Sequence, residues 1–192
     1  MLAATIRQKL GEGCRCLYLN SPAMVAGLRS CLAATGIDVG CEVAKARLVL
    51  SSEPVTTPDG GFDVDSMLHT LEEALDQALN DGFKGLWAAG DMTWEFGSEK
   101  NFAKLMEYEH RLEAIFCRRL ELYGICQYHQ DTLPREVTQQ GLLTHRTIFI
   151  NETLSRLNPH YVSAELASDQ RASDAELDEA IAGLGQLQNA KS

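Results

Sequence analysis

The chain lacks any apolar run long enough to cross a membrane, and its start lacks the features of a secretory signal. A membrane-spanning helix needs about 20 mostly apolar residues, and no run in this sequence approaches that length. Residues 1–10 carry Arg7 and Lys9 but no long apolar core and no small-residue cleavage site. We therefore expect a cytoplasmic protein that makes no contact with a membrane.

Positive charge is also scarce. The chain has 17 Lys and Arg residues against 27 Asp and Glu residues, which gives a formal net charge of -10 at pH 7. Such a chain repels the phosphates of nucleic acids unless it carries a local basic patch. The only adjacent basic pair, Arg118 and Arg119, has Glu113 and Glu121 nearby, so we expect solvated surface there. Direct binding of nucleic acid is not predicted.

The six cysteines do not form the pattern of a disulfide framework or of a zinc site. Most fall in predicted strands or helices, where we expect small core side chains in a reducing compartment. Cys14 and Cys16 would share one face of a strand, and Cys126 and His129 have a spacing found among metal ligands. Neither pair has the second half that structural zinc requires. No metal and no cofactor are predicted.

Strands that alternate with helices predict an α/β fold. The strands are apolar throughout, which is typical of a parallel sheet covered on both faces. They are predicted at residues 14–19, 48–50, 85–89, 124–128 and 147–150. Helices are predicted at residues 3–10, at about 98–122 and at 134–143. Two more are predicted from residue 22 to a stop at Gly36, and from a cap at Asp63 or Asp65 to Gly82. Residues 37–46 are predicted to form a short helical or irregular connection. We expect three layers around a mainly parallel sheet.

The last 30 residues differ in composition, being rich in Ala, Asp, Glu and Gln. Ser173 and Glu176 form a capping box. A narrow apolar stripe follows at Leu177, Ile181, Leu184 and Leu187. We expect a C-terminal helix that packs on the domain or joins two copies in a homodimer, with a linker helix as the alternative.

Two acids near the carboxyl edge of the sheet are the main candidates for a site. Asp91 follows the apolar strand at 85–89, where it could be a site acid or a turn-former. Glu109 fills a gap in the apolar stripe of the next helix, formed by Phe102, Leu105, Leu112, Phe116 and Leu120. A buried carboxylate is costly unless it is paired or protonated, so Glu109 needs a partner, either structural or a ligand. Ligands of open α/β sheets bind at this edge.

The order of the strands resembles a RecA/KaiC-like nucleotide-binding core. In those proteins an acid at a strand tip holds magnesium, and a Gly-rich loop after the first strand binds phosphate. Here residues 20–29 take the place of that loop, and they contain no G-x-x-x-x-G-K-[ST] pattern and no lysine. Pro22 also removes a backbone donor. A conventional ATPase is therefore not predicted.

A set of short motifs, each weak alone, follows an order and spacing that is fairly specific. The motifs are Gly36-Ile37-Asp38-Val39, Gly61-Phe62-Asp63, Gly82-Phe83-Lys84-Gly85-Leu86, Gly90-Asp91-Met92-Thr93-Trp94, Tyr108-Glu109, Cys126-Gln127-Tyr128 and Asn158-Pro159-His160-Tyr161. Together they resemble the MEDS domain, the methanogen/methylotroph sensory domain of DcmR-like regulators. The resemblance spans about residues 5–162, so we predict a MEDS-like domain at 1–162 and a helical tail at 163–192. Family members usually begin with a His-containing strand and a helix, and this chain starts at or inside that helix, so we expect the family's N-terminal strand to be missing. The family's common His-Pro is His145-Arg146 here.

This resemblance implies a ligand-sensing domain of KaiC-like fold that has lost the nucleotide machinery and is often fused to histidine kinase or DNA-binding modules. The implied ligands are small hydrocarbon derivatives. We therefore predict a non-catalytic, cytoplasmic sensory domain for a small, largely apolar ligand, with a histidine kinase or a transcription regulator as partner. The predicted ligand-binding residues are Asn20, Ser51, Glu53, Asp91, Met92, Trp94, Glu109, Tyr128 and His145.

Other interpretations stay open. A diverged nucleotide-binding enzyme would use Asp91 with Mg²⁺ and Glu109 as a base, although no nucleophile motif and no catalytic residue is predicted. A ligand-free adaptor would instead bind a kinase or a transcription regulator through its acidic surface and C-terminal helix. Met92 and Trp94 could equally cover the sheet as ordinary core residues, and each histidine could be structural.

Overall fold

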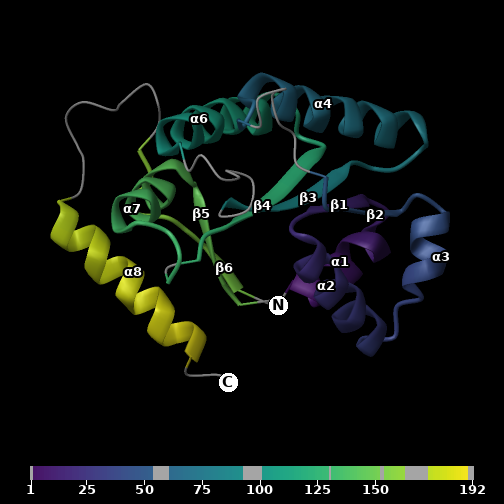
Figure 1. The fold of residues 1–192 in the computed structure, drawn as a ribbon, viewed down its shortest axis with the longest axis horizontal. Coiled ribbons are helices and arrows are strands. Elements are labelled where there is room, and N and C mark those ends of the chain that lie inside the picture. The colour runs from purple at the N-terminus through teal and green to yellow at the C-terminus, as the bar shows by residue number, and fades with distance from the viewer. Residues whose placement is uncertain are drawn as a thin grey trace. The chain divides into compact units, whose positions relative to one another are not determined.

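The computed structural model describes residues 2–53, 61–92, 101–129, 131–151, 154–162 and 173–189 (Figure 1). The chain divides into two compact units, Met1–Gln127 and Tyr128–Ser192, and each is described by itself. The predicted division into residues 1–162 and 163–192 concerns the extent of the family resemblance, and it stays a prediction.

The first unit contains a four-stranded parallel sheet with the order β2-β1-β3-β4. Its strands are β1 (Arg15–Leu19), β2 (Leu48–Ser51), β3 (Leu86–Asp91) and β4 (Leu122–Gln127). Every residue of β1 is buried, as expected for a central strand with helices on both faces. The predicted α/β fold with a parallel sheet is confirmed.

Helices cover both faces of this sheet (Figure 1). One face carries α1 (Leu2–Glu12), α2 (Pro22–Ala34) and α3 (Val39–Ala44), and the other carries α4 (Val64–Asn80) and α6 (Phe102–Arg118). On the first face, Ile6 and Leu32 of the helices pack with Tyr18 and Trp87 of the strands in one buried cluster. The result is the predicted three-layer arrangement.

Short polar side chains begin the helices of the first unit. Ser21 accepts a hydrogen bond from the backbone N–H of Met24, with Pro22 at the first helical position. Asp63, and not Asp65, caps α4, because its carboxylate accepts the N–H of Ser66 at 3.1 Å. The capping residue of α4, which the sequence left open, is thereby identified.

The long helix ends earlier than predicted. The apolar spacing predicted a helix over about 98–122, but α6 ends at Arg118 and Leu122 already belongs to β4. Leu120, predicted to lie on the buried stripe, is 74% exposed. Pairing of the turn with β3, in which the carbonyl of Glu121 accepts the N–H of Leu86, overrides the local helical pattern. The part of the prediction before residue 101 lies outside the described residues.

The cysteines are only partly core residues. None of the six, all within the described residues, forms a disulfide. Burial raises the pKa of the Cys16 thiol to about 12, so it stays a neutral core side chain. The prediction is wrong for Cys31 and Cys117, which lie on exposed helix faces.

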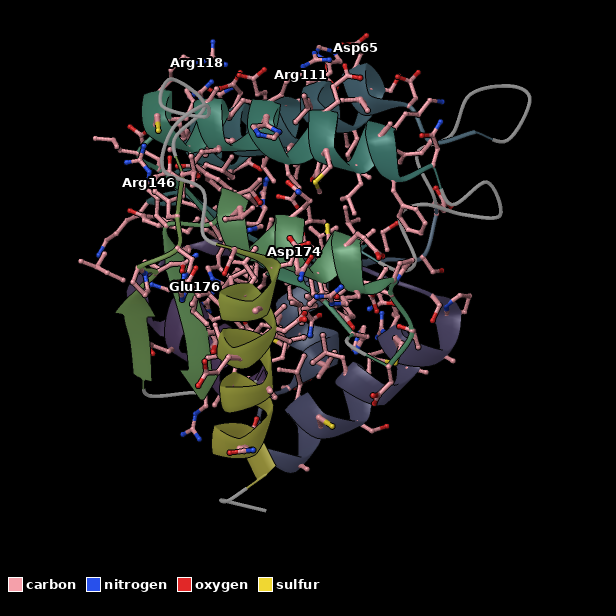
Figure 2. All side chains as sticks on the ribbon, turned by 90° about the vertical axis from the view of Figure 1, so that its left-hand side faces the viewer. Asp65, Arg111, Arg118, Arg146, Asp174 and Glu176 are labelled. Atoms are coloured by element: carbon pink, nitrogen blue, oxygen red, sulfur yellow. The ribbon has the colours of Figure 1, made fainter. Side chains whose placement is uncertain are left out.

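The outer face of α4 and α6 carries a row of ion pairs between the two helices. Figure 2 shows Arg111 beside Asp65, and the Nη2–Oδ1 distance is 2.5 Å. Arg118 pairs with Glu72, and Arg119 pairs with Asp76 on α4. The Arg118–Arg119 pair is thus neutralised at the surface, in line with the predicted solvated position.

The second unit is built differently from the first. It contains α7 (Arg135–Thr144), β5 (Thr147–Asn151), β6 (Leu154–Leu157) and α8 (Asp174–Asn189). β5 and β6 form an antiparallel pair, and β6 was not predicted from the sequence. The predicted C-terminal helix is α8, whose capping box joins Ser173 and Glu176. Leu177 of α8 is buried with Leu142 and Leu143 of α7.

Asn158 of the predicted Asn-Pro-His-Tyr motif has a structural role in the second unit. Its side-chain amide donates to the backbone carbonyls of Leu142 and His145, the latter at 2.7 Å. Its own N–H donates to the carbonyl of Arg146 at 2.8 Å. These bonds satisfy carbonyls at the end of α7 that the helix itself leaves unpaired.

Arg15 is a buried cation that anchors the start of β1. Its Nε donates to the carbonyl of Ala46 at 2.7 Å, its guanidinium pairs with Asp81, and the ring of Phe83 lies 4.6 Å away. The hydrogen bond from Arg15, with a further one from Gln77, holds the pKa of Asp81 below its ordinary value of 3.8. Asp81 therefore stabilises the fold when it is ionised.

We predict that Gly85→Ala destabilises the first unit. A Cβ at this position would lie 2.2 Å from the backbone oxygen of Glu121, so the strands must shift. We expect a loss of about 1–3 kcal/mol in the free energy of unfolding, measured with urea. Gly27→Ala in α2 is the matched control, because nothing lies within 4 Å of its Cβ, and it should stabilise by about 0.5–1 kcal/mol. Equal effects of the two changes would contradict the close approach.

We predict that Asp81→Asn lowers stability at pH 7 and that this loss shrinks in acid. Because the folded pKa of Asp81 is depressed, its contribution is present above pH 3.8 and disappears as the pH falls through the folded value. Urea unfolding of both proteins from pH 7 to pH 2.5 measures the difference. Glu73→Gln, exposed on α4, the helix whose C-terminal cap is Asp81, should change stability by less than about 0.5 kcal/mol. A difference that does not depend on pH would contradict the role of Asp81.

Candidate functional site

The carboxyl ends of β1 and β3 flank the point where the sheet reverses its winding direction. From β1 the chain proceeds to β2 on one side, and it later returns to β3 on the other. The connection through α2 and the connection through α4 cover opposite faces, and open α/β sheets generally bind their ligands at such a point. Asn20 directly follows β1, and Asp91 is the last residue of β3. Two predicted site residues therefore lie at the position where open α/β sheets bind ligands.

Asn20 joins the two strand ends by hydrogen bonds. Its Nδ2 donates to the hydroxyl of Tyr18 at 2.8 Å and to Oδ2 of Asp91 at 3.3 Å. Asn20 is 1% exposed and Asp91 is 5% exposed. Burial raises the pKa of the Tyr18 hydroxyl, and the negative charge of Asp91 raises it further. The hydrogen bond from Asn20 lowers this pKa, but by less than burial raises it. Tyr18 is thus a neutral hydroxyl that accepts from Asn20.

The start of α2 uses its own donors. The N–H of Ser21 donates to Oδ1 of Asn20 at 2.7 Å, and the N–H of Met24 donates to the Ser21 hydroxyl at 3.4 Å. Pro22 has no N–H. In a phosphate-binding loop these backbone donors would point at the ligand. Here they are paired within the chain or missing.

Glu109 lies on the opposite face of the sheet from Asp91. Asp91 pairs in register with Gln127, and the preceding pair is Gly90 with Cys126. Because side chains alternate along a strand, Asp91 and Cys126 point to opposite faces of the sheet. Glu109 of α6 is 2% exposed, and its Oε2 accepts a hydrogen bond from the Cys126 thiol at 3.7 Å. Glu109 therefore has a partner, as its burial required. These two side chains could supply two metal ligands, whereas structural zinc takes four.

The remaining predicted site residues are distributed as follows. The carbonyl of Ser51 accepts the N–H of Asn20 at 3.2 Å, while Glu53 is exposed beyond the strand. Met92 is 1% exposed on the α6 side, and Trp94 lies outside the described residues. Asn20, Ser51 and Asp91 are therefore brought together.

Tyr128 and His145 belong to the second unit, where their rings meet edge to face. The centroids are 5.7 Å apart at an angle of 83°. His145 Nδ1 lies 2.7 Å from the carbonyl of Gly141, and this contact fits a protonated Nδ1 that donates to the carbonyl. The two rings therefore contact each other within the second unit.

A pocket between α6 and the sheet was not predicted from the sequence. Its volume is about 30 Å³. Strands β3 and β4 contribute Ala88, Gly90, Gly124 and Cys126 to its lining, and the helices contribute Leu71, Tyr108, Leu112 and Phe116. The sequence does contain a signal for this pocket. Small residues stand at every second position of two strands, Ala88 and Gly90 in one and Gly124 and Cys126 in the other. The pocket is lined mainly by apolar groups.

We predict that Asn20→Ala costs about 1–3 kcal/mol of stability, because Tyr18 and Asp91 lose a shared buried donor. Urea unfolding measures the loss. Ser30→Ala, exposed on α2, should change stability by less than about 0.5 kcal/mol. In the Asn20→Ala background, Tyr18→Phe should cost less than it does in the parent protein. Strictly additive effects of the two changes would contradict the bond between them.

None of the described helices is long and apolar enough to span a membrane. The family model of the methanogen/methylotroph, DcmR sensory domain (MEDS) matches residues 1–146, well over half of the chain. No curated protein and no solved structure matches the chain. The family match agrees with the resemblance carried by the motifs around Asp91, Glu109 and Cys126, and it includes all four strands of the parallel sheet. The chain belongs to the MEDS family of sensory domains.

Proposed function

We propose that this protein is a non-catalytic sensory domain that binds a small, largely apolar molecule in the pocket between α6 and the sheet. Membership of a sensory-domain family supports the general role. The pocket supports the ligand class, because its lining offers mainly apolar side chains. The thiol of Cys126, which contacts Glu109, is one of its few polar groups. Ligand binding there would act directly on α6.

The observation that carries this proposal is the pairing of the donors at the start of α2. A nucleotide phosphate needs backbone N–H groups that point outward at a helix N-terminus. The N–H groups of Ser21 and Met24 are bonded within the chain, and Pro22 has none. Binding of a nucleotide would have to break these bonds. This favours a ligand that needs no phosphate site.

The positions of the two acids weigh against the alternative of a diverged Mg²⁺-dependent enzyme. That mechanism requires that a metal held by Asp91 and the base Glu109 act on the same reacting group. The two side chains leave the sheet on opposite faces, and Asp91 already accepts a hydrogen bond from Asn20. A shared reacting group would need a rearrangement of the sheet edge.

The output of the domain is proposed to be a change in a helix contact that a cytoplasmic partner detects. A histidine kinase or a transcription regulator is the partner class that fits a sensory domain. Helix α8 carries acidic residues in its first turn, Asp174 and Glu176, and packs on α7 through Leu177. This helix is the proposed contact for such a partner or for a second copy of the chain. An adaptor without a ligand is the alternative, and it predicts that no small molecule stabilises the protein.

A thermal-shift comparison tests the proposed function. The purified protein is heated with ATP and Mg²⁺, and separately with small halogenated compounds, alcohols and thiols. We expect stabilisation by a small apolar compound, because a ligand that binds only the folded state at 100 times its Kd adds about 2.7 kcal/mol. We expect no shift with ATP.

Stabilisation by ATP would contradict the proposal and would favour the enzyme, and Asp91→Asn should then abolish it. Absence of a shift with every small compound would favour the adaptor. Ser30→Ala serves as a control that leaves both proposed sites intact.

A further inference from the structure

The floor of the pocket is made by small residues at the middle of β3 and β4. Ala88 pairs in register with Gly124, and Gly90 pairs with Cys126, so all four residues face α6. Strand positions that face a covering helix in a parallel sheet are usually filled with Val, Ile and Leu, whereas Ala88, Gly90 and Cys126 are small and half-buried and Gly124 is exposed. The missing side-chain volume at these four positions leaves the space between the sheet and the helix.

The roof of the pocket approaches this floor closely at one end. A Cβ built on Gly124 would lie 3.0 Å from Cζ of Phe116 and 3.1 Å from the carbonyl oxygen of Ala88. The ring of Phe116 therefore rests on the backbone of β4, where no larger residue fits without a shift. Tyr108 and Leu112 continue the roof along α6. Phe116 and Gly124 both line the pocket, and their close approach narrows it.

The volume limits what can enter. A water molecule needs about 10–15 Å³ on this measure, and an apolar cavity that binds benzene has about 150 Å³. The pocket of about 30 Å³ is thus far too small for a six-membered ring. It has room for two or three non-hydrogen atoms.

We infer that Ala88 and Phe116 set a size limit for the ligand, which admits molecules of two or three non-hydrogen atoms and excludes rings. This inference rests on the proposed function, because it assumes that the pocket is the ligand site. Ala88 limits the pocket from the sheet, and Phe116 limits it from the helix. Specificity then comes from volume and not from hydrogen bonds.

Xenon and benzene are the two probes of the test. Xenon is a single apolar atom, and it should shift the methyl NMR signals of pocket residues such as Met92 and Leu112 in the parent protein. Benzene should neither shift these signals nor raise the melting temperature. The variant Phe116→Ala removes the ring that narrows the pocket over Gly124, and it should gain benzene binding, seen as a rise in melting temperature with benzene.

The opposite variant fills the pocket. Ala88→Val adds two methyl groups at the floor, in a residue type that strands favour, and should abolish the xenon shifts. Ala114→Val makes the same change on the exposed face of α6 and should leave them intact. Both variants are first shown to unfold cooperatively.

The outcomes separate the inference from the proposed function. Benzene binding to the parent protein, or unchanged xenon shifts in Ala88→Val, would overturn the size limit while leaving a small-molecule sensor in place. No response to xenon in the parent protein would overturn the pocket as a site. If the broader panel of small compounds then also gave no thermal shift, the proposed function itself would fail.

Discussion

The carboxyl edge of the sheet depends on the buried side chain of Asn20. A buried amide must find partners for its polar atoms, because an unpaired one costs about 1–3 kcal/mol. Asn20 meets this requirement by donating to Tyr18 and Asp91 and by accepting from the N–H of Ser21. These bonds hold together the ends of β1 and β3 and the start of α2. They also use a backbone donor that a nucleotide would need.

The two faces of the sheet therefore differ in chemical character. The polar cluster around Asn20 lies on the α2 face, and its groups are bonded to one another. The pocket lies on the α6 face, where Ala88 and Gly124 leave room beneath Phe116. A ligand in this pocket contacts the helix and the sheet together. Its binding would favour one position of α6, which is how a sensory domain changes a contact elsewhere.

Local patterns in the sequence were sufficient for the layers and for most elements. Apolar runs and caps such as Asp63 depend on neighbours in the chain, so the strands and helices of the first unit could be predicted. Tertiary pairing was not visible, which is why the long helix was extended through Leu120. The short strand β6 pairs with β5, and no local pattern marked it.

The candidate site was predicted in part for the same reason. Asn20 and Asp91 follow apolar strands, and their meeting follows from parallel strand ends sharing one edge. The prediction grouped Asp91 with Glu109, but only the register of β3 with β4 shows that they lie on opposite faces. The pocket arises from missing side chains on two strands that are distant in the sequence. Such an absence becomes a cavity only when the strands are paired and a helix covers them.

Methyl NMR of the methionines tests the central claim most directly, because two of them report on the two faces. Met92 lines the pocket, and Met24 lies in the first turn of α2 with 43% of its surface exposed. With a small apolar compound, the account predicts a shift of the Met92 signal and none of the Met24 signal. With ATP and Mg²⁺ it predicts no shift of either signal. A saturable shift of Met24 with ATP would contradict the account and place a nucleotide at the start of α2.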